Sequence, residues 1–555
     1  MSRLIIDPIT RIEGHLRIEV EIENGKVKDA WSSGTLFRGF EIFMRDRDPR
    51  DAWYITQRAC GVCTAVHALA SVKCLDHAFG VEVPTNARLI RNLILGSQYL
   101  HDHPVHFYHL HALDWVDVTS ALKADPVKTA AFSSNLNNAP GDSANHFREV
   151  KKRLQKFVES GQLGPFANGY WGHPEYRLPP EANLMAVSHY LDALVIQRKA
   201  AKLQAIFGGK NPHIQTTIPG GVTVGGILDA NHIASFKFAM KEVVDFVNNV
   251  YIPDILAVAP AYLDWAGIGK GHGNYLSWGM LPHDSKHHTK NQVFPDGVIW
   301  NRDLSRVEDA DTLKVNEHVK HSWYKDDAPQ HPKTGKTEPE YTGLNDFKGI
   351  DPSKNPKYSW LKSPRYNDEV MEVGPLSRVL VAYARGNKDI QNIVNGALKK
   401  LGAGPSALFS TLGRTAARAL ETSFIGQEMD KWVDELIGNI GKGDLATANQ
   451  YEVPDSGFGY GTTEAPRGAL GHWIEIKNKK IHNYQLVVPT TWNGSPRDEK
   501  GVRGPFEESL IGTPVRDAKR PLEILRTIHS FDPCIACSVH VIDPASNEVH
   551  KFKVL

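Results

Sequence analysis

Alternating apolar and polar residues between positions 14 and 33 predict a β-hairpin. Every second residue from 16 to 22 is aliphatic and the residues between them are charged, so one face of the strand is expected to be buried. Asn24 and Gly25 follow, a pair that accepts the positive φ angles of a type I′ turn. A similar pattern over residues 472–489, with Asn478 at the turn, predicts a second hairpin near the end of the chain.

Helical periodicity governs most of the remaining chain. A helix-forming run that starts at residue 65 stops at Gly80, a residue typical of helix C-termini. Further helical runs are predicted at residues 86–111 with a kink at Pro104, and at 180–206, 228–250, 403–440 and 521–529. We therefore expect an α+β protein that is mainly helical, with a central bundle of long helices and peripheral β-hairpins.

Residues 266–365 have weak periodicity and are rich in Gly, Pro, His, Asp and Lys. This composition predicts loops and short strands, and the scattered tryptophans argue against a disordered linker. We expect a surface elaboration that covers a partner interface. The histidines of residues 101–111 wrap around their helix and do not line one side, so they do not predict a zinc site; Asp102 among them is a candidate buried charge.

Composition narrows the class of protein. The 555 residues include 64 Lys and Arg against 63 Asp and Glu, so the chain lacks the basic field that favours nucleic-acid binding. A mean hydropathy of −0.35 and the absence of an apolar run of about 20 residues predict that the chain does not cross a membrane. Its start also lacks the apolar segment and cleavage site of an export signal.

Four of the five cysteines form two CxxC pairs, Cys60 with Cys63 and Cys534 with Cys537. A single CxxC is ambiguous, because a redox disulfide, a zinc or iron-sulfur site and a clamp on another soft metal all use it. Two pairs at opposite ends predict that the ends meet at one buried site. At about 150 residues per domain the length suggests several domains, but a shared site favours one large interlaced domain. The fifth cysteine, Cys74, is expected to be a small buried hydrophobe.

Three further residues have ordinary interpretations when each is considered alone. Glu13 stands at the entrance of the first predicted strand and would be a solvated or salt-bridged turn residue. His67, one helical turn after Cys63, is expected to be a hydrogen-bonded core histidine, with indirect support of a metal ligand as an alternative. Arg467, between a proline and a glycine, would be a surface arginine. The thiols of Cys60 and Cys63 are expected at a helix N-terminus, which lowers a thiol pKa.

Together, however, these residues resemble the large, catalytic subunit of nickel-iron hydrogenases. The resemblance covers essentially the whole chain and follows the family's ordered motifs. The motifs are RIEGH at residues 11–15, RACGVCT at 58–64, APRG at 465–468 and DPCIACSVH at 532–540. The four motifs together identify the family with high specificity, whereas either CxxC motif alone is a weak identifier.

The resemblance implies roles for individual residues. Cys60 and Cys534 would be terminal nickel ligands, and Cys63 and Cys537 would bridge nickel to an iron that carries carbonyl and cyanide ligands. Glu13 would take protons from Cys534, while Arg467, Asp102 and Asp532 would surround the open coordination face. Thr490 would bond a cyanide, and Pro466 and His67 would border the cofactor. A second site, usually magnesium, would use Glu41, the backbone carbonyl of Leu486 and His540.

The chemistry of the residues agrees with this resemblance. Thiolates are soft donors that suit nickel and iron. Dihydrogen is a very weak acid, so splitting it needs a metal together with a base, either Cys534 or, as the competing base, Arg467. A carboxylate with a pKa near the operating pH, as in Glu13, suits the onward transfer of the proton.

The resemblance also implies partners and a location. Because the paired thiols are committed to one centre, a second subunit must carry the iron-sulfur clusters. In the family this small subunit often bears a twin-arginine signal, which would place the heterodimer in the periplasm or at the membrane. Before export, nickel-insertion chaperones and a dedicated endopeptidase would act in the cytoplasm. Residues 541–555 fit the extension that this endopeptidase removes after His540, which leaves residues 1–540 as the catalytic domain.

Three alternatives remain at this stage. A hydrogen-sensing regulatory subunit would keep the metal centre but turn over slowly, and the C-terminal extension argues against it. A structural protein with a zinc or cluster site of four thiolates would leave Glu13, Arg467 and the extension without roles. The related quinone-reductase subunit of respiratory complexes shares the fold but has generally lost the thiols.

Overall fold

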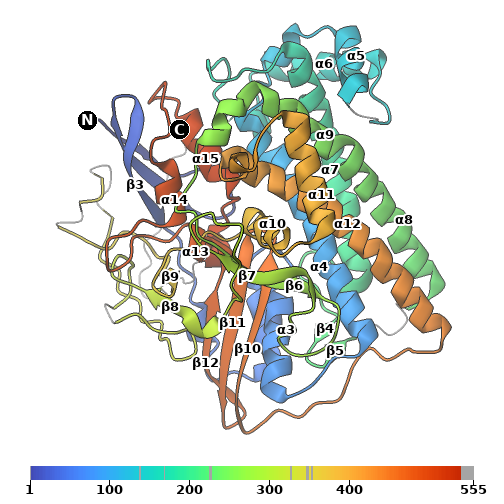
Figure 1. Cartoon of the computed structure of the whole chain (residues 1–555), viewed down its shortest axis with the longest axis vertical. Helices are drawn as coiled ribbons and strands as arrows, with labels where there is room; N and C mark the ends of the chain where they lie inside the picture. Colours follow the sequence, from blue (N-terminus) through green and yellow to red (C-terminus); the bar gives the residue numbers. More distant parts are fainter. Residues whose placement is uncertain are drawn as a thin grey trace.

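Four long helices form a bundle along one side of the molecule (Figure 1). Helix α4 (Thr85–Val105) packs between α7 (Pro180–Gly208) and α12 (Thr411–Gly441), and α8 (Ala230–Phe246) lies against α7 and α12. Helix α12 begins where the Ser410 side chain accepts the backbone N–H of Gly413, which satisfies one of its unpaired amides. The bundle confirms the long helices expected from the sequence.

The computed structural model describes residues 2–136, 139–167, 169–223, 228–325, 328–344, 349–351 and 354–538. The side chains of Pro165, Cys537 and Ser538 lie outside the described part, as do His540 and the predicted extension of residues 541–555. The shorter elements are β4 (Thr217–Ile218), β5 (Gly221–Val222), α1 (Phe40–Phe43), α2 (Ala52–Thr56), α9 (Ile252–Val258), α11 (Lys388–Leu401), α13 (Pro489–Asn493) and α16 (Ile535–Ser538).

An antiparallel sheet of β10 (Ser456–Ala465), β11 (Gly468–Lys477) and β12 (Lys480–Val487) carries α3 (Val66–Phe79) on one face. Gly459 and Gly461 let the helix approach closely, because a Cβ at either position would collide with the α3 backbone. The β11–β12 pair is the predicted second hairpin, with Asn478 at positive φ in its turn. Strand β10 was not predicted.

The two ends of the chain pack together. Strands β1 (Ser2–Ile6), β2 (Leu16–Glu23) and β3 (Lys26–Gly34) form a sheet that shares a buried apolar cluster with α14 (Pro505–Leu510) and α15 (Leu522–Ser530). Figure 1 shows these blue and red segments side by side. Asn24 and Gly25 both have positive φ, as the predicted type I′ turn requires. The expected meeting of the termini is therefore present in the fold.

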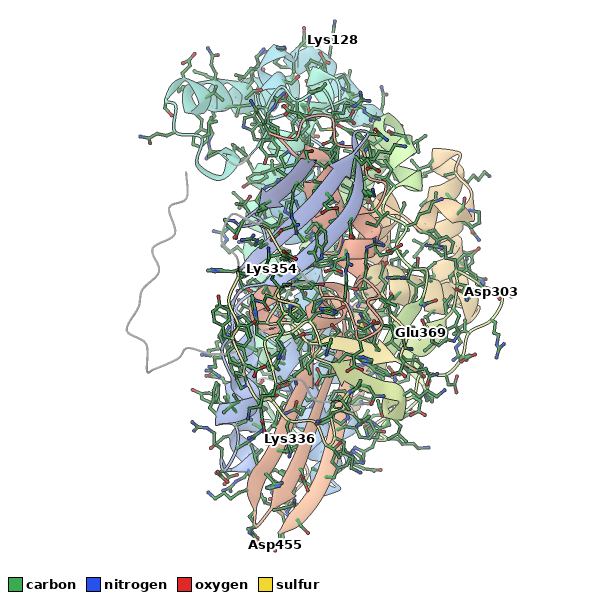
Figure 2. All side chains as sticks on the ribbon, turned by 90° about the vertical axis from the view of Figure 1, so that its left-hand side faces the viewer. Lys128, Asp303, Lys336, Lys354, Glu369 and Asp455 are labelled. Atoms are coloured by element: carbon green, nitrogen blue, oxygen red, sulfur yellow. The ribbon has the colours of Figure 1, made fainter. Side chains whose placement is uncertain are left out.

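A small helical lobe extends one end of the molecule. Helices α5 (Pro126–Leu136) and α6 (Ala144–Glu159) pack on α7 around a core that includes Phe147 and Leu154. In Figure 2, Lys128 of this lobe and Asp455, just before β10, lie at opposite ends of the molecule. The three-stranded N-terminal sheet lies between them.

Residues 266–365 contain short strands as expected, but they are more than a surface elaboration. Strands β6 (Tyr275–Pro282) and β7 (Gln292–Ile299) form a hairpin, and β8 (Val315–His318) pairs with β9 (Ser363–Tyr366). Strand β6 is almost wholly buried because it packs on β10 and on α10 (Pro375–Ala384). The expectation of a purely peripheral segment was wrong for this part.

The predicted helical run at residues 86–111 is present. Helix α4 contains Pro104 and is followed directly by a π-helix, η3 (His106–His111), so the chain continues helically past the proline. By length and composition alone, the helical run Ala230–Gly267 is long and apolar enough to cross a membrane. Half of its apolar window is buried inside the protein, as is common for a core helix.

Candidate metal centre

Three buried thiols from the two ends of the chain converge. The Sγ atoms of Cys60 and Cys534 lie 3.3 Å apart, and the sulfurs of Cys60, Cys63 and Cys534 all lie within 4.8 Å of one another. Their exposed fractions are at most 2%. The side chain of Cys537, the fourth predicted thiol, lies outside the described residues, although its backbone belongs to α16, next to the other three.

The loop that carries the first thiol pair is fixed by hydrogen bonds. The backbone amides of Val62 and Cys63 donate to Cys60 Sγ at 3.3 and 3.2 Å, an arrangement that favours a thiolate. Gln98 of α4 accepts from the Ala65 amide and donates to the Val62 carbonyl. The pair lies in a turn just before α3, which begins at Val66, so it precedes the helix N-terminus as expected.

Glu13 contacts the second thiol pair through both its backbone and its side chain. Its amide donates to Pro533 O and its carbonyl accepts from the Ile535 amide, which forms a parallel bridge to the C-terminal segment. Its Oε2 accepts from the Ala536 amide at 3.1 Å and lies 3.6 Å from Cys534 Sγ. Burial, together with the nearby Cys60 thiol, raises the pKa of the Glu13 carboxyl.

Arg467 bridges two buried carboxylates over the thiols. Its Nη1 lies 3.1 Å from Asp102 Oδ2 and its Nη2 lies 3.1 Å from Asp532 Oδ1. Burial disfavours the guanidinium charge, but Asp532 and Cys534 outweigh it and raise the pKa of Arg467. Burial also raises the pKa of Asp532, against the opposing effect of Arg467. The expectation of a surface arginine was wrong, because the turn between β10 and β11 points inward.

The donor set suits a soft metal. Thiolate sulfurs bind nickel and iron well, and two polar atoms nearby, Asp532 Oδ2 and Arg467 Nε, are buried without a hydrogen-bond partner among the described residues. Such orphaned atoms are rare in a finished protein interior. They are consistent with a site that a bound group completes.

The residues predicted to border the cofactor are also close by. The Thr490 hydroxyl accepts the Cys534 amide at 3.1 Å, so its own proton is free for another acceptor. The Pro466 carbonyl accepts from Arg378 at 2.9 Å in the β10–β11 turn. His67 is a buried, hydrogen-bonded histidine as expected, with Nδ1 3.1 Å from His472 Nε2, and burial lowers its pKa to about 4.

A second cluster surrounds Glu41. Its Oε1 accepts from the Leu486 amide at 3.0 Å, and its Oε2 faces the Lys362 ammonium at 3.1 Å. Lys362 also contacts Glu317 at 3.1 Å, and burial raises the pKa of Glu317 to about 7. Glu41 and Leu486 thus lie together through the Leu486 amide, while the carbonyl role predicted for Leu486 stays a prediction and the predicted partner His540 lies outside the described residues.

Comparisons with known proteins agree with this geometry. A family model described as nickel-dependent hydrogenase matches residues 38–540, and one described as HoxL-like matches residues 3–33. The chain belongs to the nickel-dependent hydrogenase family. It is therefore an oxidoreductase that acts on dihydrogen, with nickel and iron as its metals.

Relatives of this hydrogenase match along its whole length. It is 48% identical to the uptake hydrogenase large subunit of Bradyrhizobium diazoefficiens, covering 100% of this chain and 97% of the relative. The hydrogenase-2 large chain of Escherichia coli K12 is 47% identical, with 100% of both chains covered. The fold matches the Ni-Fe-Se hydrogenase from D. vulgaris Hildenborough with a TM-score of 0.79 at 36% identity, over 97% of this chain and 100% of that one.

Sequence reasoning missed several residues that shape the hydrogenase site. Gln98 joins the Cys60 loop to Asp102, because its amide donates to Asp102 Oδ1 at 2.6 Å. Its position four residues before Asp102 on one helix face was the available signal. The Cys60 carbonyl contacts His213 Nε2 at 2.9 Å, and Lys362 contacts Glu41. No local pattern distinguishes these last two residues from ordinary surface positions.

Proposed function

We propose that this chain is the catalytic large subunit of a heterodimeric hydrogenase that takes up dihydrogen. The observation that carries the proposal is the convergence of thiols from both chain ends beneath Arg467, with Glu13 in contact with one of them. Relatives named uptake hydrogenase large subunit support the direction of the reaction. The sensor alternative lies within the same family and differs in its turnover rate.

Cys60, Cys63, Cys534 and Cys537 would hold nickel and iron, and the iron would carry carbonyl and cyanide ligands. When bound, these metals supply the electron-accepting centre at which dihydrogen is cleaved heterolytically. The thiols of Cys60, Cys63 and Cys534 are buried, and Gln98 and the Glu13 bridge fix the backbone beside them. The metals would therefore enter a rigid, water-poor site in which electrostatic interactions are strong.

The proton would move from Cys534 Sγ to Glu13 Oε2. The two atoms are 3.6 Å apart, a hydrogen bond in which the thiol donates to the carboxylate. A raised pKa brings the Glu13 carboxyl closer to neutral pH, where it can both accept and release a proton. The Ala536 amide holds the carboxylate in place as it does so.

Arg467 would provide fixed positive charge over the open face of the metals. Asp102 and Asp532 hold its guanidinium from two sides, and Asp102 is itself fixed by Gln98. A guanidinium that is pre-oriented in this way needs no reorganisation when charge develops beneath it. In the alternative mechanism, Arg467 and not Cys534 is the base.

Glu41, the Leu486 carbonyl and His540 would form the second, magnesium site. The proximity of Glu41 to Leu486 supports this assignment. A hard cation prefers carboxylate and carbonyl oxygens of this kind. Lys362, in contact with the other oxygen of Glu41, would orient that carboxylate.

Electrons would leave through an iron-sulfur small subunit, since the sequence has no further cysteine pair for a cluster. We infer that this subunit brings the heterodimer to the periplasm or membrane, after nickel-insertion chaperones and an endopeptidase that removes residues 541–555 have acted in the cytoplasm.

The test is hydrogen-dependent dye reduction by the heterodimer, co-expressed with its small subunit and maturation proteins. The proposal expects sustained turnover that requires nickel in the growth medium. Turnover equal to that of nickel-free preparations would overturn it. Nickel-dependent but very slow turnover would instead support the sensor.

A further inference from the structure

A buried carboxylate, Asp114, lies between the two segments that carry Glu13 and Cys534. It ends the 3₁₀-helix η4 (Ala112–Asp114) and is fully buried. Its Oδ1 accepts from Arg11 Nη2 at 2.5 Å, and its Oδ2 accepts from His529 Nδ1 at 2.6 Å. Arg11 stands two residues before Glu13, and His529 stands five residues before Cys534. One carboxylate therefore binds both segments.

Hydrogen bonds close the cluster on the side of His529. Its Nε2 lies 2.8 Å from Thr10 O, a carbonyl that can only accept, so the ring donates there. Burial opposes the charge of Asp114, but Arg11 and His529 outweigh it and hold the pKa of Asp114 well below its usual range. The carboxylate is therefore charged and accepts from both side chains.

The oxygens of Asp114 are already bound by side chains. His111, Asp114 and His529 lie close enough together to hold an ion, but Arg11 binds one oxygen of Asp114 and His529 binds the other. His111 accepts the Trp115 Nε1–H on its Nε2, so its Nδ1 carries the proton that faces Asp114 at 3.3 Å. The arrangement is an ion pair between Arg11 and Asp114 with two histidines beside it.

The backbone that this cluster holds is conformationally unfavourable. Arg11 and Asp532 are non-glycine residues with φ of 56° and 58°, a region that L-residues seldom adopt and that persists only where surrounding contacts enforce it. Arg526 adds a further contact, from its Nε to the Asp114 carbonyl at 2.7 Å. The segments on both sides of Asp114 therefore depend on tertiary contacts for their path.

We propose that Asp114 is a positioning residue that sets the separation between the Glu13 carboxylate and the Cys534 thiol by binding Arg11 and His529 at once. It touches neither dihydrogen nor the metals. The inference rests on the proposed role of Glu13 as proton acceptor, and it assigns Asp114 the task of keeping that acceptor within reach.

The test compares proton exchange per nickel atom in variants of the whole heterodimer. Asp114→Asn keeps the shape of the side chain but removes the charge that binds Arg11 and His529. We expect nickel and iron contents to stay near wild type, while deuterium exchange between D₂ and water falls about tenfold or more, since displacement of a reacting group by about an ångström has effects of this size. The infrared band of the protonated Glu13 carboxyl, identified by its loss in Glu13→Gln, should shift.

Asp254→Asn is the matched control. Asp254 is also a buried carboxylate that binds a histidine, His189, and it also accepts from Tyr108. This variant should lose stability but keep its exchange per nickel and its infrared band. Equal exchange per nickel in the Asp114→Asn and Asp254→Asn variants would overturn the proposal.

A second variant covers the case in which Asp114→Asn takes up no nickel. Arg11→Lys keeps a cation beside Asp114 but loses the second donor, which binds the Leu110 carbonyl. Its exchange rate per nickel should lie between the rates of wild type and Glu13→Gln. A wild-type rate would count against the proposal. Normal exchange in Glu13→Gln would instead refute the proton role of Glu13 itself.

Discussion

The Sγ atoms of Cys60 and Cys534 lie 3.3 Å apart although the two residues are 474 positions apart in the sequence. The contact closes the chain around a site to which both ends contribute. The N-terminal sheet and helices α14 and α15 share one buried apolar cluster, so this closure is stabilised by packing as well as by the thiols. A ligand substitution at either end should therefore remove the metals without unfolding the protein.

Cys60→Ser should greatly lower nickel content, because a hydroxyl is a harder and less acidic donor than a thiol. Elemental analysis of purified chain checks this. The control is Cys74→Ala, which removes another buried thiol, one that donates to the Gly459 carbonyl of β10. It should cost about 1 kcal/mol of stability and leave nickel content intact. Full nickel in Cys60→Ser would remove that residue from the ligand set.

Glu13→Gln should keep its metals but lose proton exchange with solvent. Glutamine preserves the acceptor for the Ala536 amide, so the local structure should stay in place, whereas an amide cannot take up a proton at neutral pH. Hydrogen–deuterium exchange in the reduced heterodimer measures the effect. Exchange at the wild-type rate would show that protons leave by another route.

Strong local patterns made part of this architecture predictable. The Asn24-Gly25 turn, the end of α3 at Gly80 and the long helices α7 and α12 follow directly from turn chemistry and helical periodicity. Strand β10 escaped prediction because glycines at residues 457, 459 and 461 replace the apolar side chains that would mark a strand face. Their role, the close approach of α3, exists only in the folded chain.

Some residues of the site are marked by a pattern in the sequence, whereas others are brought to it only by the fold. The thiols carry a spacing signal that any reader of the sequence can find. Glu13 and Arg467 look ordinary alone and became candidates only through resemblance to a family. Asp114 and Lys362 carried no signal, because their burial and their partners come from segments far away in the sequence. Tertiary contacts of this kind produce no periodic pattern in the sequence.

Arg467→Lys should lower turnover by about a hundredfold while metal content stays the same. Lysine keeps the positive charge but cannot bridge Asp102 and Asp532 with two fixed N–H donors. Hydrogen-dependent dye reduction, normalised to nickel, checks the prediction. Unchanged turnover would mean that the orientation of the guanidinium is unimportant.

The free energy of unfolding should fall with rising pH because of His189. Burial opposes its charge, but Asp254 and Asp142 outweigh this effect and raise the His189 pKa from 6.5 to about 10. The folded protein thus binds this proton more tightly than the unfolded chain. Its stabilising contribution, at most about 5 kcal/mol, is complete below pH 6.5 and is lost as the pH rises through about 10.

The melting temperatures of wild type and His189→Gln, measured between pH 6.5 and pH 10, isolate the contribution of His189, because all other titrating groups are shared by the two proteins. The difference between the two proteins should narrow steadily from pH 6.5 to pH 10. A constant difference would show that His189 does not carry a proton in the folded state.

Glu41→Gln should lower magnesium content. Glutamine keeps a neutral oxygen near the Leu486 amide but removes the charge that a hard cation requires. Elemental analysis after dialysis against magnesium checks the outcome, with Glu340→Gln as a control, since Glu340 is a carboxylate that pairs with a different lysine, Lys357. Equal magnesium in both variants would place the second metal elsewhere.

We expect the thiols brought together from the two chain ends to hold nickel and iron. The most direct test is elemental analysis of the processed heterodimer combined with nickel X-ray absorption, in wild type and in Cys534→Ser. We expect nickel and iron in equal amounts, with sulfur neighbours around nickel, and loss of nickel in the variant. Zinc without nickel in an active preparation, or a fully loaded Cys534→Ser protein, would contradict it.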